Sequence, residues 1–323
     1  MGKSDPQPTT INRLTAGFYP AMALLAGVQL DLFTVLRGDP LSAGQIAIRL
    51  QLDPGKLRPL LYALCKAGLL KVEDNHFSNT AEADYFLVRG KPTFMDSLGL
   101  FLTDFWGAAW QSAATIRTGL PQASHSATEE QAFIHYLDAR NRTVGKQLST
   151  QFDLSPYKTV VDVAGGAGGL ALALVEAYPQ LEATIIDLPT VTPLAEAAIA
   201  AAEATQQVRS LAVDLLREPL PGTYDVAVLH RFTNVLGAEA ARRVIHKVGA
   251  AVNPGGMVII RGPILDDSRL SPAAVVDVNL ALINLFAGGE AHTEGEHRAW
   301  LTEAGFTAIE RIGPDLVVAQ KAA

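Results

Sequence analysis

The sequence predicts an α/β protein in which a mostly parallel sheet, covered by helices on both faces, follows a smaller and mostly helical domain. Three observations favour this fold. Apolar strands alternate with amphipathic helices from residue 159 to residue 261, as in a parallel sheet. A cluster of glycines separates the first of these strands from the helix after it. The chain has 323 residues, of which 49% are hydrophobic, which is typical of two domains.

Charge and composition limit the expected partners. The formal net charge of −7 argues against a general affinity for nucleic acid or for an anionic membrane. The start MGKSDPQPTT is polar and no long apolar run follows, so neither a signal peptide nor a membrane span is predicted. Cys65 is the only cysteine and cannot form an internal disulfide. We therefore expect a cytoplasmic protein in which this thiol fills the core.

Residues 1–90 form the predicted N-terminal domain. A helical pattern over residues 11–36 is apolar on more than one face, so this helix is either buried or packed against a second subunit. Two helices and a two-stranded wing follow, the arrangement of a winged helix. These elements are expected over residues 43–50, 54–67, 69–72 and 76–78.

Winged helices commonly bind DNA, so this function has to be considered. The second helix offers only Lys56, Arg58 and Lys66 as cations, interleaved with leucines. Useful affinity at physiological salt needs several phosphate contacts. A dimerisation scaffold is therefore favoured, and the expected partner is a second copy of the chain rather than nucleic acid.

Residues 91–323 form the predicted second domain, which begins with a helical cap over residues 91–152. The cap is rich in aromatic side chains, among them Phe105, Trp106 and Trp110, and one of its helices also carries His135. Most of these rings are expected to pack in the core. Some of them are candidates to line a cleft for a flat substrate.

The stretch TVVDVAGGAGGLALALVEAYPQLEATIIDLP, residues 159–189, predicts a strand, a glycine turn, a helix and a second strand that ends at Asp187. Glycines such as Gly165, Gly166 and Gly168 allow the backbone to approach a ligand, and the helix N-terminus directs N–H groups toward it. Asp187 is placed to accept hydrogen bonds from a ribose diol. The unit is therefore expected to hold a nucleotide-like ligand.

The glycines alone do not identify that ligand. The pattern Gly166-x-Gly168-x-x-Ala171 also satisfies the dinucleotide fingerprint, and a glycine turn sometimes serves only tight packing. Asp162 lies just before the turn, where a carboxylate repels a pyrophosphate but suits a cationic amine or sulfonium. S-adenosylmethionine has both cations and no phosphate. We expect it, or its demethylated product S-adenosylhomocysteine, as the cofactor, with a nicotinamide dinucleotide as the alternative.

Strands and helices continue to alternate after residue 187, and the chain is expected to end in a hairpin. A mostly parallel sheet with a terminal antiparallel strand is typical of the Rossmann-like fold of S-adenosylmethionine-dependent methyltransferases. The expected strands cover residues 208–213, 225–229, 257–261, 307–312 and 316–320, and the expected helices cover residues 191–204, 237–252 and 293–304.

Motifs along nearly the whole chain resemble those of the small-molecule O-methyltransferases of the caffeate and hydroxyindole type, which have an N-terminal winged-helix dimerisation domain. The stretch DVAGGAG at residues 162–168 is similar to the family's DVGGGxG motif. The other matching motifs are DLP at 187–189, DLL at 214–216, PLP at 219–221, NPGG at 253–256, GG at 288–289 and TE at 293–294.

The resemblance implies how the cofactor is held. The three loop glycines would bracket its methionine part through their backbone, and Asp187 would hold the ribose. Asp214 would bind the adenine amino group, with Leu215 packed on the ring. The first glycine of the family motif is Ala164 here. Structural alternatives remain for two acids, since Asp214 also suits a strand-end cap and Asp162 a buried turn.

The catalytic end departs from the family, in which a helix begins His-Asp-Trp and that His is the general base. In the family, 20 residues separate this His from the Pro of the PGG turn, and counting back 20 from Pro254 gives Asn234. His230 then matches the family's cofactor-contacting lysine. The stretch HRF that begins at His230 loosely matches His-Asp-Trp, which leaves His230 as a possible substitute base.

Two acidic positions that orient the base in many family members are also replaced, by Gly262 and Ala291. None of these residues abstracts a proton near neutral pH. General-base catalysis typically contributes about 10²–10⁴-fold, whereas proximity contributes more, so methyl transfer can survive this loss. The bacterial polyketide-tailoring branch of the family has Asn at this site too, and it includes both methylating and non-methylating members.

Two functions therefore remain. The first is O-methylation of an aromatic or polyketide-like small molecule, with Asn234 orienting the acceptor and Asn284 added to the candidate pocket residues. The second is a non-methylating reaction, such as a rearrangement, decarboxylation or hydroxylation, in which bound S-adenosylmethionine acts as a fixed positive charge. A metal site is not expected, because His230 and His292 lack a carboxylate partner.

Overall fold

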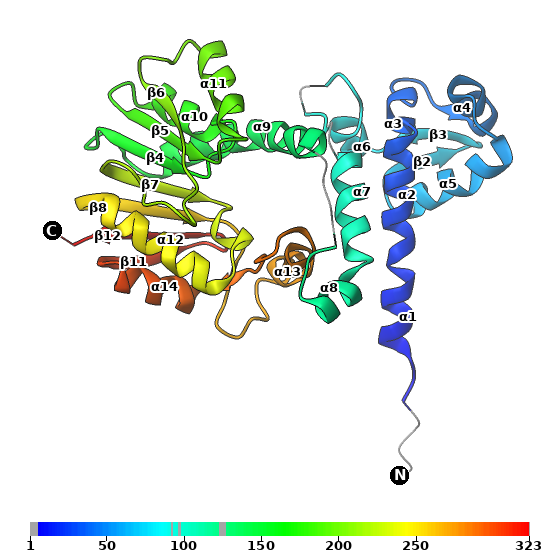
Figure 1. Cartoon of the computed structure of the whole chain (residues 1–323). Coiled ribbons are helices and arrows are strands. Elements are labelled where there is room, and N and C mark those ends of the chain that lie inside the picture. Colours follow the sequence, from blue (N-terminus) through cyan, green and yellow to red (C-terminus); the bar gives the residue numbers. More distant parts are fainter. Residues whose placement is uncertain (1–5, 92, 96–97, 123–126, 323) are drawn as a thin grey trace. The chain divides into compact units, whose positions relative to one another are not determined.

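The computed structural model describes residues 6–91, 93–95, 98–122 and 127–322. The chain divides into two compact units, Met1–Asp104 and Phe105–Ala323. Figure 1 shows several helices and a small sheet in the first unit, and a large sheet with helices around it in the second.

The N-terminal unit contains the two helices and the wing that the sequence predicts. A capping box begins α4 (Ala43–Leu50), because the Ser42 hydroxyl accepts from the Gln45 N–H while the Gln45 side chain accepts from the Ser42 N–H. Asp53 caps α5 (Pro54–Lys66). The antiparallel wing has a third strand beyond the two expected, because β3 (His76–Asn79) pairs with β1 (Leu41–Ser42) as well as with β2 (Leu70–Glu73). The helix α6 (Ala81–Phe86) follows it.

The prediction of a single helix over residues 11–36 was wrong in detail, because the structure has three helices there. α1 (Thr9–Ala16) and α2 (Phe18–Gln29) meet at Gly17, which keeps right-handed helical dihedrals, so they lie nearly in line in Figure 1. α3 (Leu32–Val35) begins after Asp31, whose φ of +52° is left-handed. A right-handed helix cannot continue through such a residue.

One face of α1 and α2 is apolar and exposed. Its members recur at intervals of three or four residues, as on one side of a helix. Among the described residues they have little covering, and Tyr19 is 70% exposed. The set consists of Ile11, Leu14, Phe18, Tyr19 and Met22.

A seven-stranded sheet is the centre of the C-terminal unit. The strand that is antiparallel to both of its neighbours is β12 (Leu316–Lys321), while the pairs from β8 to β6 are all parallel. The Rossmann-like fold with a terminal antiparallel strand is thereby confirmed. In order across the sheet the strands are β11 (Phe306–Ile312), β12, β8 (Val252–Arg261), β7 (Tyr224–His230), β4 (Thr159–Val163), β5 (Glu182–Asp187) and β6 (Val208–Ala212).

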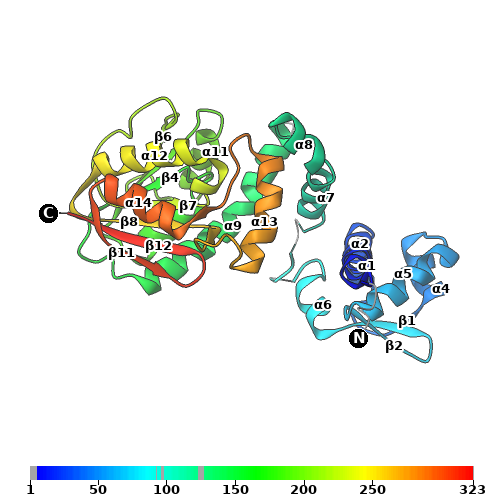
Figure 2. The same cartoon turned by 90° about the horizontal axis from the view of Figure 1, so that it is seen from below.

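Helices cover both faces of this sheet, and alternate residues of its strands face them. Val161 belongs to the core beneath α12 (Ala238–Ala251) and α14 (Glu294–Glu303), which lie side by side in Figures 1 and 2. Val160, the preceding residue, packs with α9 (Ala127–Gln151), α10 (Gly169–Ala177) and α11 (Thr192–Ala201) on the opposite face. This explains why the strands are apolar throughout rather than alternating.

Some elements were not predicted. α13 (Ala273–Leu285) is apolar on nearly all sides, so it gives no helical periodicity. β9 (Ile264–Leu265) and β10 (His292–Thr293) are only two residues each and pair in parallel with one another. Within the helical cap expected over residues 91–152, the structure has α7 (Leu98–Ala109) and α8 (Ser112–Thr118) before α9.

The strand order reverses its direction at β4. β5 and β6 lie on one side of β4, and β7 and β8 lie on the other. In open sheets of this kind, ligands bind beyond the carboxyl ends of the strands at the point where the order reverses. The site is therefore built from the residues that follow β4, β5 and β7.

Candidate active site

In the turn after β4, close packing and the backbone angles both require glycine. A Cβ on Gly165 would lie 2.8 Å from the Asp162 carboxylate, and a Cβ on Gly168 would lie 2.4 Å from Ile185. Gly168 and Gly166 also have left-handed φ angles, of +87° and +60°. A Cβ on Gly166 would meet nothing nearer than 3.6 Å among the described atoms. Gly166 is thus the loop glycine that leaves room beside the backbone.

Ala164 adopts the conformation that its position requires of a glycine. Its φ is +56°, in the left-handed region that costs an alanine about 1–2 kcal/mol. The family motif has glycine here, and the alanine that replaces it occupies this position with backbone strain.

Asp187 lies at the end of β5, and both of its carboxylate oxygens accept from backbone N–H groups. The Gly166 N–H donates to Oδ2 at 2.8 Å, and the Leu188 N–H donates to Oδ1 at 2.7 Å. The acid therefore ties the glycine turn of one strand to the end of the next.

Asp162 is 2% exposed at the end of β4. Burial, followed by the nearby charge of Asp187, raises its pKa to about 7. Its Oδ2 atom has no hydrogen-bond partner among the residues that the structure describes. A buried carboxylate with an unused oxygen fits a cationic ligand, which would favour the ionised form.

Asp138, on α9, is a third acid at this turn and was missed by sequence reasoning. Its Oδ1 accepts from the Gly169 N–H, the first residue of α10, at 2.8 Å, and its charge also raises the pKa of Asp162. A Cβ on Gly169 would lie 2.6 Å from the Asp138 carbonyl oxygen. No local motif marks this acid, since 31 residues separate it from Gly169.

The three acids decide which ligand suits the turn. N–H groups at a helix N-terminus normally attract phosphate. Here the N–H groups of Gly166 and Gly169 already donate to carboxylates, which repel a pyrophosphate and attract a cation. The residues present therefore fit S-adenosylmethionine, and they disfavour the nicotinamide dinucleotide that the glycine fingerprint left open.

Asp214 follows β6, next to the end of β5, because the Val213 N–H donates to the Asp187 carbonyl at 2.8 Å. Its carboxylate accepts from the Leu216 N–H at 3.0 Å. Leu215, only 5% exposed, packs in the core on the α12 side of the sheet. The Lys247 ammonium anchors the loop by donating to the Leu215 carbonyl at 2.6 Å.

His230 is the last residue of β7 and is a poor base in this structure. Burial, with smaller effects from the Arg231 and Arg261 charges, lowers its pKa to about 4. The imidazole is therefore neutral near pH 7 and retains an abstracted proton weakly. Its Nδ1 atom is buried and finds no partner within the described part of the chain.

Asn234 lies in η1 (Thr233–Val235), a 3₁₀ turn directly after β7. It is 3% exposed, and its Oδ1 atom has no partner among the described residues. A Cβ on Gly262 would lie 3.2 Å from that oxygen. The Asn234 carbonyl accepts from the Glu290 N–H at 3.1 Å, beside the fully buried Ala291. The three positions that the sequence motifs matched to the family's base and two acids thus lie together, without any of those groups.

The candidate pocket residues differ in their surroundings. Asn284 is fully buried, and its amide donates to the Ser112 hydroxyl at 2.9 Å and to the Leu280 carbonyl at 2.8 Å. Its Oδ1 is without a partner in the described residues. Trp106 is half-buried and Trp110 is 72% exposed. The side chains of Phe105 and His135 lie outside what the structure describes.

Metal ligation is not indicated at this site. Within the described ranges, no group of three His, Cys, Asp or Glu side chains is arranged to hold an ion. His292 uses its Nε2 atom on two backbone carbonyls instead, those of Thr233 and Leu236.

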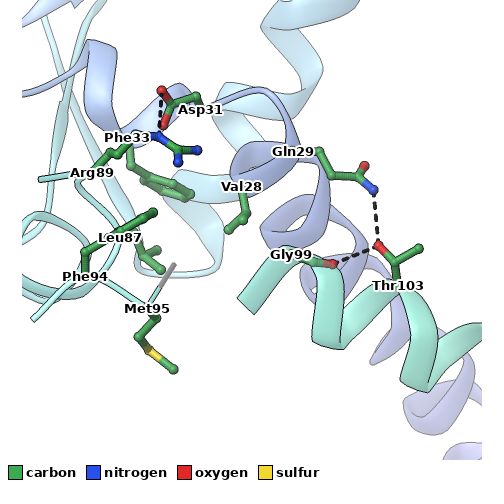
Figure 3. A pocket seen from close by; sticks show the side chains of 10 residues that line it. All are labelled: Val28, Gln29, Asp31, Phe33, Leu87, Arg89, Phe94, Met95, Gly99 and Thr103. Atoms are coloured by element: carbon green, nitrogen blue, oxygen red, sulfur yellow. Dashed lines mark hydrogen bonds and ion pairs between the residues drawn. The ribbon is translucent and has the colours of Figure 1, made fainter. Parts of the chain in front are cut away.

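The N-terminal unit has a cavity of about 340 Å³, lined on one side by α2 and on the other by residues such as Leu87, Phe94 and Thr103 (Figure 3). The two charged residues that line it, Asp31 and Arg89, pair with one another at 3.6 Å. Gln29 donates to the Thr103 hydroxyl at 3.4 Å on the opposite wall. Of the predicted site residues whose side chains the structure describes, none lines this cavity.

The fold and the acid-lined glycine turn define a Rossmann-like domain for a cationic nucleoside cofactor. The chain belongs to the O-methyltransferase family: the model of the O-methyltransferase domain matches residues 108–307, and that of the O-methyltransferase dimerisation domain matches residues 12–89. The resemblance inferred from the sequence motifs is thereby confirmed.

Individual relatives agree with this assignment. The chain is 33% identical to the tetracenomycin polyketide synthesis 8-O-methyltransferase of Streptomyces glaucescens over 95% of both chains. It is 29% identical to the 3-hydroxy-5-methyl-1-naphthoate 3-O-methyltransferase of Streptomyces sahachiroi, covering 94% of this chain and 91% of that one. Human N-acetylserotonin methyltransferase, solved with S-adenosylmethionine, has the same fold, with a TM-score of 0.83, 23% identity and full coverage of both chains.

The family assignment confirms three predictions. The protein is an enzyme of the S-adenosylmethionine-dependent O-methyltransferase class, its cofactor is the one that the sequence indicated, and its N-terminal part is a dimerisation domain. In the portion of the chain that the structure describes, no helix has both the length and the apolar composition needed to cross a membrane.

Proposed function

We propose that this enzyme methylates a hydroxyl group of a flat, largely apolar aromatic or polyketide-like small molecule, by placing the acceptor rather than by using a histidine base. The observation that carries the mechanism is the buried Asn234, with Gly262 and Ala291 beside it where the family has a base and two acids. The names of the Streptomyces relatives, which methylate a polyketide and a naphthoate, support the acceptor class.

The glycine turn and the acids would hold the cofactor. Asp187 would bind the ribose, Asp214 would bind the adenine, and Asp162 and Asp138 would balance the positive charge. When bound, S-adenosylmethionine supplies a methyl group activated by a sulfonium. Because Asp162 has a raised pKa and an unused oxygen, a nearby cation is the charge that best stabilises its ionised form.

Asn234 would orient the acceptor. Its buried Oδ1 atom accepts a hydrogen bond, so an acceptor hydroxyl that donates to it keeps an oxygen lone pair free for attack. An amide does not take the proton, which must leave to water. This arrangement favours acidic hydroxyls, such as phenols, over aliphatic alcohols. Asn284, with a second buried carbonyl oxygen that no described group contacts, would bind another polar group of the acceptor.

A non-methylating reaction is the second candidate, and the neutral surroundings of Asn234 favour it. His230, with a pKa of about 4, is a weak substitute base. A reaction driven by the fixed charge of the cofactor needs no base at all. Under this alternative the same acceptor is converted while the cofactor keeps its methyl group.

Two measurements separate these functions. Calorimetry should show binding of S-adenosylmethionine and of S-adenosylhomocysteine but not of NAD. Incubation of phenolic and polyketide-like acceptors with methyl-labelled cofactor should then transfer label to the acceptor. Conversion of an acceptor without label would favour the alternative, and tight binding of NAD alone would overturn both.

The second copy of the chain is expected on the exposed apolar face of α1 and α2, within the N-terminal domain proposed over residues 1–90. Tyr19→Arg places a charge on this face and should convert a dimer to a monomer in sedimentation experiments. Lys71→Glu, on the exposed wing strand β2, is the control that should remain dimeric. A dimeric Tyr19→Arg variant would place the interface elsewhere.

A further inference from the structure

The short turn that carries Asn234 is weakly closed by its own backbone. η1 has three residues, and its bonds are the Val235 N–H to the Phe232 carbonyl at 3.1 Å and the Leu236 N–H to the Thr233 carbonyl at 3.3 Å. Turns of this type have poor hydrogen-bond geometry and are stable only in short pieces. Support from outside the turn therefore determines how firmly it is held.

His292, on β10, supplies part of that support. Its Nε2 atom lies 3.0 Å from the Thr233 carbonyl and 2.9 Å from the Leu236 carbonyl. Both carbonyls only accept, so Nε2 must carry the proton and donate to the two oxygens. The ring is 1% exposed and bridges the two ends of the turn, with Asn234 between them.

His297, on α14, holds the side chain of the same threonine. Its Nδ1 atom lies 2.8 Å from the Thr293 carbonyl, so Nδ1 donates and Nε2 accepts. The Thr233 hydroxyl lies 3.3 Å from Nε2 and is the donor. Burial lowers the pKa of His297 to about 4, which keeps this proton arrangement fixed near neutral pH.

Three groups from one segment thus converge on one turn. The Glu290 N–H contacts the Asn234 carbonyl, His292 contacts the carbonyls on either side, and His297 contacts the Thr233 hydroxyl. The two rings pack on one another at 5.9 Å between centroids and against Trp300 at 5.0 and 5.5 Å. If His292 served only to fill the core, it would not need to donate to both ends of this turn.

We propose that His292 and His297 are positioning residues of the acceptor site, which fix the direction in which Asn234 presents its amide. They act through the backbone carbonyls and the Thr233 hydroxyl of η1. This inference rests on the proposed function, because Asn234 serves an acceptor only there. Ala291 stands where many family members have an orienting acid. The inference gives an orienting role to two other residues of the same segment, His292 and His297.

Nuclear magnetic resonance of the full-length protein tests the placement without any acceptor. The Asn234 side-chain amide signal, assigned with Asn234→Ala, should move in Thr233→Val and His292→Phe. The signal should keep its wild-type chemical shift in Thr233→Ser, which retains the hydroxyl, and in His246→Gln. His246 is a half-exposed histidine paired with Glu303 and outside the site, so it serves as the matched control. An unchanged signal in both Thr233→Val and His292→Phe would overturn the proposal.

Kinetics with methyl-labelled cofactor and a phenol that the wild type accepts tests the consequence. Thr233→Val should lower kcat about tenfold, leave KM for S-adenosylmethionine within about twofold, and be rescued by Thr233→Ser. A loss of turnover no larger than the loss of folded protein, measured by thermal unfolding, would reduce the histidines to a structural role. If the wild type methylates no acceptor, the proposed function fails, and the amide signal still decides the placement of Asn234.

Discussion

The two sides of the candidate site are built from opposite kinds of groups. On the cofactor side, Asp138 and Asp187 accept directly from backbone N–H groups of the glycine turn, and Asp162 lies buried beside them. On the acceptor side, Asn234 is a neutral amide and His230 a neutral imidazole. Under the proposed function, charge is thus concentrated where the cation would be held, and the side chains that would meet the acceptor are weak bases or none.

This difference indicates that the chain contributes to catalysis by placing the cofactor and the acceptor rather than by moving a proton. Proximity and orientation lower the barrier without a proton-transfer group. The acceptor must then supply an acidic hydroxyl itself. Variants on the cofactor side should therefore change affinity, and variants on the acceptor side should change turnover.

The largest effect is expected at Asp187. Asp187→Asn removes the charge from two hydrogen bonds to backbone N–H groups and should weaken S-adenosylmethionine binding about 100-fold. Calorimetry measures this loss. Asp153→Asn is the matched control, since Asp153 also accepts from a backbone N–H, at 3.0 Å from Ser155, but lies outside the site.

Asn234→Ala completes that comparison. It should leave S-adenosylmethionine affinity within about twofold, because Asn234 belongs to the acceptor side. A large loss of affinity in this variant would break the division between the two sides.

A pH dependence of cofactor binding should follow from Asp162. Its pKa in the free protein is raised to about 7, so this acid stabilises the free fold at low pH, and that stabilisation is lost as pH rises through about 7. A cationic cofactor favours the ionised carboxylate, so binding releases a proton. Affinity should fall by up to about tenfold per pH unit below pH 7.

Calorimetry in two buffers of different ionisation enthalpy measures the proton release. Asp162→Asn should abolish both the proton release and the slope with pH. A slope that persists in this variant would assign the titration to another group.

Adding a base should have a smaller effect than the changes at Asp187 and Asp162. Asn234→His restores the family's general base and should raise kcat about tenfold, below the usual range because its surroundings are not adapted to it. An aspartate at position 262 would reach the new imidazole, since a Cβ there lies 3.2 Å from Asn234 Oδ1. The double variant Asn234→His, Gly262→Asp should therefore exceed the single one.

The pH profile checks this explanation. Asn234→His should acquire a rise in kcat with pH, at a pKa that burial lowers from the usual histidine value of about 6.5. Asn234→Gln, which keeps an amide, should gain neither turnover nor that profile. If Asn234→His lowers turnover, the missing base does not limit the reaction.

Local patterns explain how much the sequence could predict. The glycine turn and Asp187 were predictable, because strand, turn and helix lie within about thirty consecutive residues and each has its own signal. Asn234 was found by counting from Pro254. Asp138 was not found, because its contact with Gly169 depends on how α9 packs against α10.

Long-range contacts and dihedral angles decide features of the histidines and helices that sequence patterns do not report. His292 was considered only as a metal ligand or a satisfied polar residue, and its two carbonyl partners lie 56 and 59 residues earlier in the chain. α13 was missed because a helix that is apolar on nearly all sides has no distinct apolar stripe. The break before α3 depends on one left-handed aspartate, which helical periodicity does not report.

The smallest effect is expected at Ala164, where the cofactor side carries strain. Ala164→Gly relieves a φ of +56° but adds freedom to the unfolded chain, which leaves a net gain of about 0.5–1 kcal/mol in the free energy of unfolding. Denaturant unfolding measures this gain. Ala308→Gly is the matched control, because Ala308 has a φ of +46° in a bulge of β11 and lies outside the site.

Both glycine variants should be stabilised, but only Ala164→Gly should alter cofactor binding. A glycine at position 164 loosens the turn that Asp162 and Asp187 hold, so affinity for S-adenosylmethionine should fall about twofold, while Ala308→Gly keeps the wild-type value. Such a result would show that the strained alanine preorganises the turn. A destabilised Ala164→Gly would instead mean that the alanine methyl group contributes packing that outweighs its strain.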